Sequence, residues 1–274
     1  VLGNPDYDLR GEGQPPSIES EEFLEQFRTA VSRFSVLPES RKESDDIAKM
    51  FDVSAETWKK ATKAQMLAVT SPEVLHISTH GFVLAYDAAA AGRSVLPDPL
   101  DRTGLALAGA NAYLDGSASG DGFLFASEVA ALDLHQTDIV TLSACQTGLG
   151  DVVSGDGLRS LQRAFTAAGA RSVVASLWEI PDVPARTLFI SFYEALLGGA
   201  SRAKALHNAV DSLSKCFPHH PIAWGGFVLY GESGPLSRFD GIKPLTVLKL
   251  NMDNRTPPKP TPAEQAEALI VLGQ

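Results

Sequence analysis

The stretch DIVTLSACQTGLG, residues 138–150, begins with β-branched and apolar residues and then breaks into glycines. Such a run, closed by a turn signal, predicts a buried strand. A second stretch, EVLHISTHG at residues 73–81, has the same form and also ends in glycine. One chemically reactive side chain stands near the end of each run, Cys145 in the first and His80 in the second. The pattern therefore predicts two strands that each end on such a residue.

Strand-like and helix-like segments alternate along the chain. Further strands are expected at residues 34–40, 171–180 and 223–231, and helices at 17–34, 43–51, 54–67, 122–132, 156–170, 184–199 and 201–215. Because most of these strands are almost continuously apolar, the sequence predicts an α/β fold with a mainly parallel central sheet flanked by helices on both faces. Chemistry in such sheets gathers at the carboxyl ends of the strands, which places His80 and Cys145 at one edge.

Composition narrows the class of protein. The chain has 274 residues, 44% hydrophobic and 20% charged, which suits one large or two small globular domains. A net charge of −10 argues against nucleic-acid binding, and two cysteines favour a reducing, cytoplasmic setting. There is no apolar run of about 18 residues to span a membrane. The start at Val1 without Met suggests a piece of a longer parent.

Cys145 and His80 could form a nucleophile and base. A free thiol has a pKa of about 8.5 and needs a base or a positive neighbour to become nucleophilic, and imidazole titrates near neutrality. Each residue alone has a structural reading, as a buried core cysteine and a core histidine. Glycines beside them, Gly81, Gly148 and Gly150, let a substrate approach the backbone closely and favour the catalytic reading of the pair.

A wider set of segments resembles a known family. VLHISTHG, DIVTLSACQTGLGDVVSGDG, LQRAFTAAGARSVVASLWEIPD, FYEALLGG and PIAWGGFVLYGE, in this order, are similar to the CHAT domain. That family is caspase-like and related to separases, gingipains and caspases. The resemblance implies a caspase-like peptidase domain at residues 1–232. The remaining residues, 233–274, are Pro-rich and mixed, which predicts a partly ordered extension with a strand expected at 245–250. It also implies an upstream or partner TPR-type regulatory region that gates the protease.

The resemblance assigns roles to residues. It implies that His80 is the general base, Cys145 the nucleophile, and the N–H groups of Gly81 and Cys145 the oxyanion donors, with no third acid. The expected activity is that of a cysteine endopeptidase acting on a protein or peptide substrate. The alternative is a catalytically quiet caspase-like module for protein interaction or regulation. No cofactor, metal, nucleic acid or membrane partner is expected.

Specificity rests on a likeness to separases at LWEIPD. There, an aspartate at the position of Asp182 pairs with a P1 arginine, so Asp182 is expected at the floor of an S1 pocket that prefers Arg or Lys. The alternative is an N-cap for the helix that begins at Pro184. Asp156 is a competing acid with a similar capping alternative, and Trp178 is expected in the pocket wall.

Other residues receive lesser roles. His76 is expected in the core because it shares a strand face with His80. Cys216 is expected to be a bystander thiol, and His219 and His220 lack the neighbours of a metal site. Residues 82–121 are expected to form a long loop, either a merely flexible insertion or a segment that orders on activation or is cut by the enzyme, with Arg93 and Arg102 as candidate cleavage sites.

Overall fold

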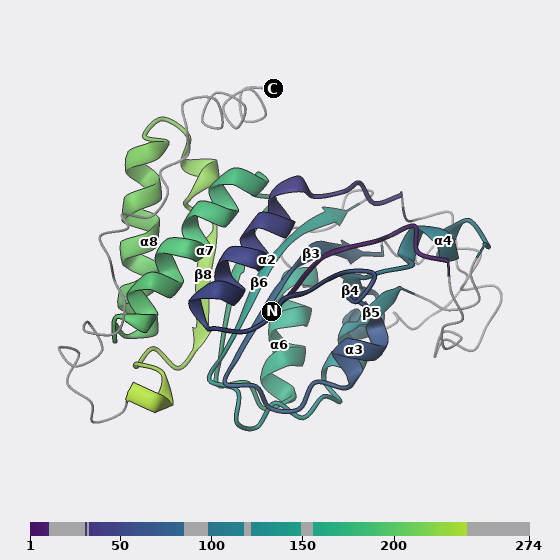
Figure 1. Cartoon of the computed structure of the whole chain (residues 1–274), viewed down its shortest axis with the longest axis horizontal. Coiled ribbons are helices and arrows are strands. Elements are labelled where there is room, and N and C mark those ends of the chain that lie inside the picture. Colours follow the sequence, from purple (N-terminus) through teal and green to yellow (C-terminus); the bar gives the residue numbers. More distant parts are fainter. Residues whose placement is uncertain (11–30, 32, 85–97, 118–121, 149–155, 240–274) are drawn as a thin grey trace.

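The computed structural model describes residues 1–10, 31, 33–84, 98–117, 122–148 and 156–239; at 145–148, 156–158 and 239 only the backbone is described. These residues form one mixed sheet with helices on both faces (Figure 1). Its main strand order is β2 (Glu56–Trp58), β1 (Leu2–Pro5), β3 (Val74–Val83), β6 (Ile139–Gly148), β7 (Ser172–Ser176) and β8 (Phe227–Gly231). The first five of these strands run parallel and β8 is antiparallel.

A short antiparallel extension widens the sheet beyond the end of β1. β4 (Thr103–Ala106) pairs with the last three residues of β3, and β5 (Phe123–Phe125) pairs with β4. β1 pairs with β3 only as far as Ser78. The neighbour of β3 therefore changes from β1 to β4 close to His80.

Helices cover both faces of the sheet. α2 (Pro38–Met50), α7 (Asp182–Leu197) and α8 (Arg202–Cys216) lie side by side over one face (Figure 1). α3 (Lys63–Leu67), α5 (Ala126–Val129) and α6 (Asp156–Ala167) pack into the core on the other, and α4 (Ala110–Leu114) lies beside β4. Short 3-10 turns occupy Pro99–Asp101, Pro221–Ala223 and Ser237–Phe239. The α/β fold predicted from the alternation of segments is confirmed.

Alternate residues of the central strands enter two different cores. Leu75 and Ile77 of β3 pack with Phe165 of α6, whereas Ile139 of β6 packs with Phe189 of α7. Successive side chains of a strand point to opposite faces, so the even-numbered residues of β3 face α2 and α7. That row holds His76, Ser78 and His80, which makes this face the polar one.

Three predicted elements near the site are wrong in detail. β3 and β6 stay paired through Val83 and Gly148, so neither His80 nor Cys145 ends its strand. Residues 34–37 form no strand, because Pro38 begins α2 and proline is favoured in the first turn of a helix. The helix predicted at 54–67 is instead β2 followed by α3, since pairing with β1 prevails over helical propensity.

Further expectations meet mixed outcomes. Residues 122–132 contain β5 before α5, and the predicted loop at 82–121 contains β4 and α4 in its described part. The helix predicted at 17–34 falls mostly outside the described residues, as does the strand at 245–250; residues 31, 33 and 34 are not helical. In the described part of the chain, no helix combines the length and the apolarity that a membrane crossing requires.

Candidate functional site

The strand register brings the two candidate catalytic residues together. His80 on β3 is the pairing partner of Cys145 on β6, in an unbroken ladder of ten pairs from Val74–Ile139 to Val83–Gly148. Neighbouring strands lie about 4.8 Å apart, so the two backbones are adjacent. The side chain of Cys145 lies outside the described part of the structure. The predicted co-location of His80 and Cys145 is confirmed at the level of the backbone.

A pocket opens beside this pair on the α2 and α7 face. On β6, the pairing with β7 ends at Leu142. After β7, the chain leaves the sheet and continues to α7. The resulting cavity has a volume of about 290 Å³ and is lined from within residues 37–43, 78–80 and 179–185, with Ser143. This volume is near the lower end for ligand pockets, so it suits a single side chain better than a larger ligand.

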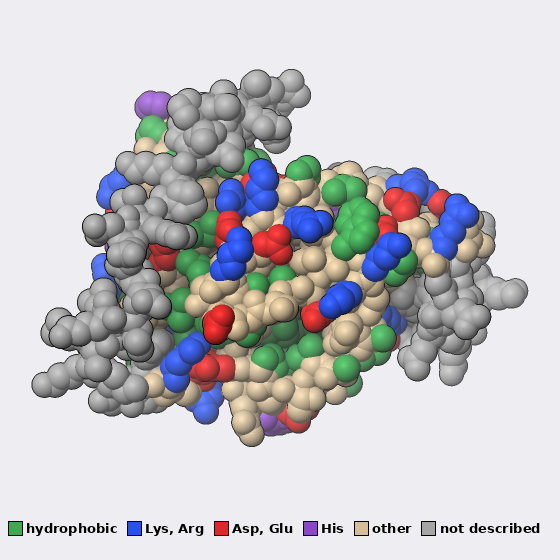
Figure 2. Space-filling model, in the orientation of Figure 1, with side chains coloured by type: hydrophobic (Ala, Val, Ile, Leu, Met, Phe, Trp, Pro, Cys, Tyr) green, Lys and Arg blue, Asp and Glu red, His purple; other side chains and the backbone are tan. Residues whose placement is uncertain are grey.

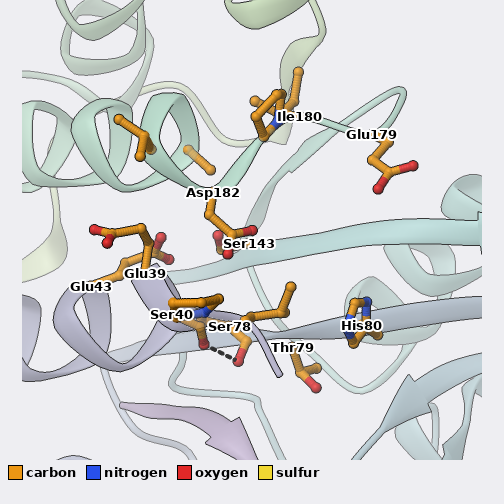
Figure 3. A pocket seen from close by; sticks show the side chains of 15 residues that line it. Glu39, Ser40, Glu43, Ser78, Thr79, His80, Ser143, Glu179, Ile180 and Asp182 are labelled. Atoms are coloured by element: carbon orange, nitrogen blue, oxygen red, sulfur yellow. Dashed lines mark hydrogen bonds between the residues drawn. The ribbon is translucent and has the colours of Figure 1, made fainter. Parts of the chain in front are cut away.

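Two hydrogen bonds fix the start of α2 over the sheet. The Ser40 hydroxyl donates to the Ser78 carbonyl at 3.0 Å (Figure 3) and accepts from the Asn4 N–H at 2.9 Å. The first turn of α2 therefore has a fixed position against β1 and β3, and its side chains form one wall of the pocket.

His80 lies in the wall of the pocket with its ring held on several sides. Its Nε2 is 2.8 Å from the Ser35 carbonyl oxygen, and the rings of Tyr7 and Phe34 lie 5.5 and 5.4 Å from its own, centroid to centroid. The residue is 7% exposed. Burial lowers the pKa of His80, while the Ser35 carbonyl and the charge of Glu179 act in the opposite direction.

The Ser35 carbonyl also selects the tautomer of His80. A carbonyl oxygen can only accept, so Nε2 must carry the proton that it donates. In the neutral ring, Nδ1 is then unprotonated and able to accept a proton. Because the pKa is lowered, this basic form predominates at neutral pH. The geometry provides a histidine that is ready to act as a base through Nδ1.

Carboxyl groups gather at the opposite end of the pocket from His80. Glu39, Glu43 and Asp182 lie together there, and Glu179 lines the rim (Figure 3). Burial raises the pKa of Asp182 to about 6, with further increases from the charges of Glu43, Glu39 and Glu179. A cation that entered this end of the pocket would relieve this repulsion.

Ion pairs distinguish these carboxyls. Glu39 binds Lys42 at 2.5 Å and Arg186 at 3.3 Å, and Glu43 binds the ring of His76 at 2.9 Å. Within the described ranges, Asp182 has no cationic partner at ion-pair distance. Asp182 is thus the pocket carboxyl best placed to receive a cation.

The alternative role for Asp182, an N-cap of the helix expected to begin at Pro184, is wrong. α7 begins at Asp182 itself, with Pro181 in the cap position. The carboxylate instead accepts a hydrogen bond from the backbone N–H of Glu39, in the first turn of α2. Such N–H groups lack partners inside their own helix, so Asp182 joins the N-termini of two helices across the pocket.

The other predicted site residues are not all brought together. Trp178 does not line the cavity; its indole N–H donates to the Ile222 carbonyl at 2.7 Å, and 39% of the residue is exposed. Gly81 lies inside the sheet between Leu105 and Gln146. α6 begins at Asp156, whose side chain lies outside the described residues.

Several lesser expectations can also be placed. Cys216 is a free thiol at the end of α8 and does not line the pocket. Arg102 follows the 3-10 turn at Pro99–Asp101, and its guanidinium donates to the Leu84 carbonyl at 3.4 Å. Arg93 lies outside the described residues. Among the described side chains, no group of three or more His, Cys, Asp or Glu could hold a metal ion.

His76 occupies a closed network behind the pocket, as its place on the strand predicts. Its Nε2 lies 2.9 Å from Glu43, its Nδ1 lies 2.7 Å from the Thr141 hydroxyl, and Thr141 bonds in turn to Tyr193 at 2.5 Å. All four residues are at most 1% exposed. The expectation of a core histidine that faces a helix is confirmed.

Sequence reasoning missed the residues that α2 and its approach contribute. Ser35, Glu39 and Glu43 fall in a segment predicted to be a strand and the start of a helix, with no motif to mark them. An acidic first turn after a proline was the available signal, since carboxylates favour helix N-termini.

Surface charge is mixed around this face. Figure 2 shows Lys and Arg side chains interspersed with Asp and Glu over the face that carries α2. No continuous basic surface forms there, so the acidic cluster of the pocket is a local feature rather than part of a charged face.

Comparisons with known proteins give the family. Tetratricopeptide repeat protein 28 of Mus musculus is 38% identical over 109 residues, or 39% of this chain and 4% of that protein; its Homo sapiens counterpart is 37% identical over 116 residues, or 42% and 5%. The chain therefore spans only a small part of the length of these relatives. The crystal structure of the Arg-specific cysteine proteinase gingipain R aligns with a TM-score of 0.48 and 12% identity, over 86% of this chain and 46% of that one.

The match to a family model covers much more of the chain than the matches to the two tetratricopeptide repeat proteins. The model of the CHAT domain matches residues 1–232, which include every residue of the pocket. The chain belongs to the CHAT domain family.

Proposed function

We propose that this chain is a cysteine endopeptidase that uses a His80–Cys145 dyad to hydrolyse peptide bonds after Arg or Lys. The observation that carries the proposal is the in-register pairing of His80 with Cys145 beside a pocket that contains carboxyl groups. A base next to a thiol is the minimum that nucleophilic catalysis by cysteine requires.

The proposed reaction begins with proton transfer from the Cys145 thiol to Nδ1 of neutral His80. The thiolate attacks the substrate carbonyl carbon to form a tetrahedral oxyanion, and the peptide C–N bond then breaks as the imidazolium protonates the leaving amine. A water molecule, deprotonated by His80, attacks the thioester and releases the new carboxyl terminus and the Cys145 thiol. The N–H groups of Gly81 and Cys145 stay the predicted oxyanion donors.

The Ser35 carbonyl takes the place of a third acidic residue in this proposal. It accepts from Nε2 at 2.8 Å, which keeps the ring in the required tautomer and would stabilise the imidazolium during the reaction. The contacts with Tyr7 and Phe34 limit rotation of the ring. An arrangement of this kind suits a dyad, because ring orientation does not depend on a carboxylate partner.

Specificity for Arg or Lys is proposed to come from Asp182. Its carboxyl lies toward the far end of a pocket large enough for one long side chain, beside Glu39 and Glu43. Burial and these neighbours already disfavour its charged form, so a cationic P1 group would be bound where negative charge is poorly compensated.

Regulation by an upstream region is a further part of the proposal. The relatives of this chain are named as tetratricopeptide repeat proteins and are far longer than the matched segment. We propose that a TPR-type array, in the same chain or in a partner, controls access to the site. Self-cleavage at Arg93 or Arg102 stays a prediction, checked by mass spectrometry of the chain after incubation.

The test is cleavage of a peptide library that carries every P1 residue, by the wild-type chain and by Cys145→Ala. Cys216→Ala is the matched control, because that thiol lies away from the pocket. Turnover that prefers Arg or Lys, is lost in Cys145→Ala and survives in Cys216→Ala would support the whole proposal. Turnover after other residues would keep the peptidase and overturn the role of Asp182.

An absence of turnover separates the two classes of function. Rapid labelling of Cys145, but not Cys216, by a thiol-directed probe would indicate a competent dyad that awaits its regulatory region. Equally slow labelling of both thiols would overturn the dyad and favour the quiet interaction module.

A further inference from the structure

We propose that Asn111 is a positioning residue for His80, acting through the backbone of Phe34 and Ser35. The inference rests on the proposed function, since it assigns the part of the fold that orients the general base. Asn111 lies in α4 and does not line the pocket.

Asn111 holds the irregular segment before α2 with both the oxygen and the nitrogen of its amide. Its Oδ1 accepts from the Phe34 N–H at 2.8 Å, and its Nδ2 donates to the Phe34 carbonyl at 3.0 Å. The residue is 1% exposed, so neither bond is exchanged readily for water. This pair of bonds fixes the peptide units on both sides of Phe34 in one orientation.

The next carbonyl along the chain is the one that binds His80. The Ser35 carbonyl accepts from Nε2, while the ring of Phe34 lies tilted beside the imidazole, 5.4 Å away from centroid to centroid. Asn111 therefore controls, through a single residue of backbone, both the hydrogen bond that selects the tautomer and one of the two rings that confine His80. A small shift of this segment would change both contacts together.

The same short helix also holds the second ring. The backbone N–H of Asn111 donates to the Tyr7 carbonyl at 2.8 Å, and the Gly109 N–H donates to the Asp6 carbonyl at 2.9 Å. Gly109 has a φ of 93°, a conformation that glycine adopts without strain. The start of α4 thus binds both chain segments whose aromatic side chains flank His80.

Tyr7 is anchored at its hydroxyl as well. Burial raises the pKa of Tyr7 well above its usual value, so the hydroxyl stays protonated. It lies 3.0 Å from the Thr79 hydroxyl, which itself donates to the Ala106 carbonyl, so Tyr7 is the donor of that pair. The ring beside His80 is consequently fixed at both ends, by α4 and by the strand that carries His80.

A cluster of ion pairs on the surface also connects the segment before α2 to the segment after β1 and to the end of α4. Arg33 pairs with Asp8 at 2.5 Å and with Asp115, the residue that ends α4. These exposed pairs are screened by solvent and contribute less than the buried amide. Ala110 and Tyr113 of α4 share an apolar cluster with Phe34, and Asn111 adds two buried hydrogen bonds to the backbone of this segment.

The critical variant is Asn111→Asp, which keeps the shape of the side chain. The carboxylate can still accept from the Phe34 N–H, but it presents a second acceptor to the Phe34 carbonyl, and the two oxygens repel. Ser117→Ala is the matched control, because within the described ranges the Ser117 hydroxyl donates to the Ala112 carbonyl of α4 at 3.0 Å and to no other group. It perturbs the same helix without a contact to the Ser35 segment.

The first readout does not depend on turnover. In the wild-type chain the Nε2 proton of His80 is shielded and hydrogen-bonded, so it should appear as a slowly exchanging NMR resonance that is absent from His80→Gln. We expect Asn111→Asp to lose this resonance while it keeps cooperative thermal unfolding, and Ser117→Ala to retain it. A folded Asn111→Asp chain with an unchanged His80 resonance would overturn the proposal.

The second readout separates positioning from binding. Because Asn111 does not line the pocket, Asn111→Asp should lower kcat by about a hundredfold, the usual scale for displacement of a reacting group by about an ångström, with KM within about twofold. An increase in KM at constant kcat would contradict positioning. If the wild-type chain shows no turnover, thiol labelling tests the proposed function, and the NMR readout alone decides the role of Asn111.

A measurement without any variant covers the case in which Asn111→Asp fails to fold. The Phe34 amide should exchange with deuterium as slowly as amides of β3, because its partner is a buried side chain rather than water. Fast exchange at Phe34 in the wild-type chain would overturn the proposal by itself.

Discussion

His76 and His80 stand four residues apart on one face of β3, yet their surroundings differ completely. His76 contacts Glu43 and Thr141 through its two ring nitrogens and is fully buried. His80 lies at a pocket, and among the described residues only the Ser35 carbonyl forms a hydrogen bond to its ring. The first histidine has both nitrogens occupied, whereas the second keeps Nδ1 available.

The difference shows how one strand can supply both stability and chemistry. Where α2 and α7 close over β3, a polar side chain must be satisfied by protein partners, and His76 is. Where β7 leaves the sheet, a pocket replaces those partners and His80 keeps an unused acceptor. The sequence alternation gives both residues the same face, but the ends of the neighbouring elements decide their roles.

The largest effect should follow from His80→Ala. Loss of a general base costs about a hundredfold to ten-thousandfold in kcat/KM. We also expect a lower thermal midpoint, because the ring is 7% exposed and packs against Tyr7 and Phe34. Peptide cleavage and calorimetry check the two statements, with His207→Ala, an exposed residue of α8, as control. Full activity in His80→Ala would show that His80 is not the general base and that its role does not differ from that of His76.

His76→Ala should have the opposite profile. It leaves Glu43, Thr141 and Tyr193 buried with hydrogen-bonding groups unpaired, which should lower the free energy of unfolding by about 3–5 kcal/mol. Denaturant unfolding measures the loss. For the fraction that remains folded, kcat should stay close to the wild-type value. An unchanged free energy of unfolding would show that the network does not stabilise the fold.

Asp182→Asn should act on specificity rather than on the chemical step. We expect the preference for Arg or Lys at P1 to fall by about ten- to a hundredfold, the scale of one charge-assisted hydrogen bond. In the wild-type chain this preference should weaken as pH falls through about 6, the pKa of Asp182, because the carboxyl becomes neutral. The variant should show no such pH dependence.

The thermal midpoint of Asp182→Asn, measured at two pH values, tests the raised pKa of Asp182 independently of activity. A raised pKa means that the fold favours the protonated carboxyl, so its contribution to stability is present below the ordinary pKa and is lost as pH rises through about 6. The amide can still accept from the Glu39 N–H. We therefore expect the variant to melt higher than the wild type near pH 8 and equally near pH 3.5; a lower midpoint near pH 8 would assign Asp182 to structure alone.

The smallest effect should come from Glu43→Gln. Glu43 lies between the buried network of His76 and the pocket that His80 lines. Glu43 bonds to His76 and lines the pocket, and its charge raises the pKa of Asp182. The amide oxygen can keep the bond to His76, so stability should hold. The P1 preference should then weaken at a slightly lower pH than in the wild type. An unchanged midpoint in the pH profile of P1 selectivity would show that the two regions are independent.

Sequence reasoning predicted the parts of the site that belong to strands. The apolar runs around His80 and Cys145 report directly on buried, adjacent strands, and the structure confirms their pairing. It could not predict Ser35 or Asn111, because their contacts join segments distant in the chain and involve backbone groups. β2 was missed for a similar reason, since its three residues are held by β1 rather than by their own propensity.

The unbroken ladder between β3 and β6 has a consequence for how this site can change. We expect point substitutions around the pocket to leave the pairing of His80 with Cys145 intact, because it is one of ten consecutive backbone pairs whose register is set by the apolar residues of both strands. A single inserted or deleted residue between Val74 and Thr79 would instead turn the His80 side chain to the opposite face of the sheet. The site should therefore tolerate wide drift in composition and almost none in the length of its two central strands.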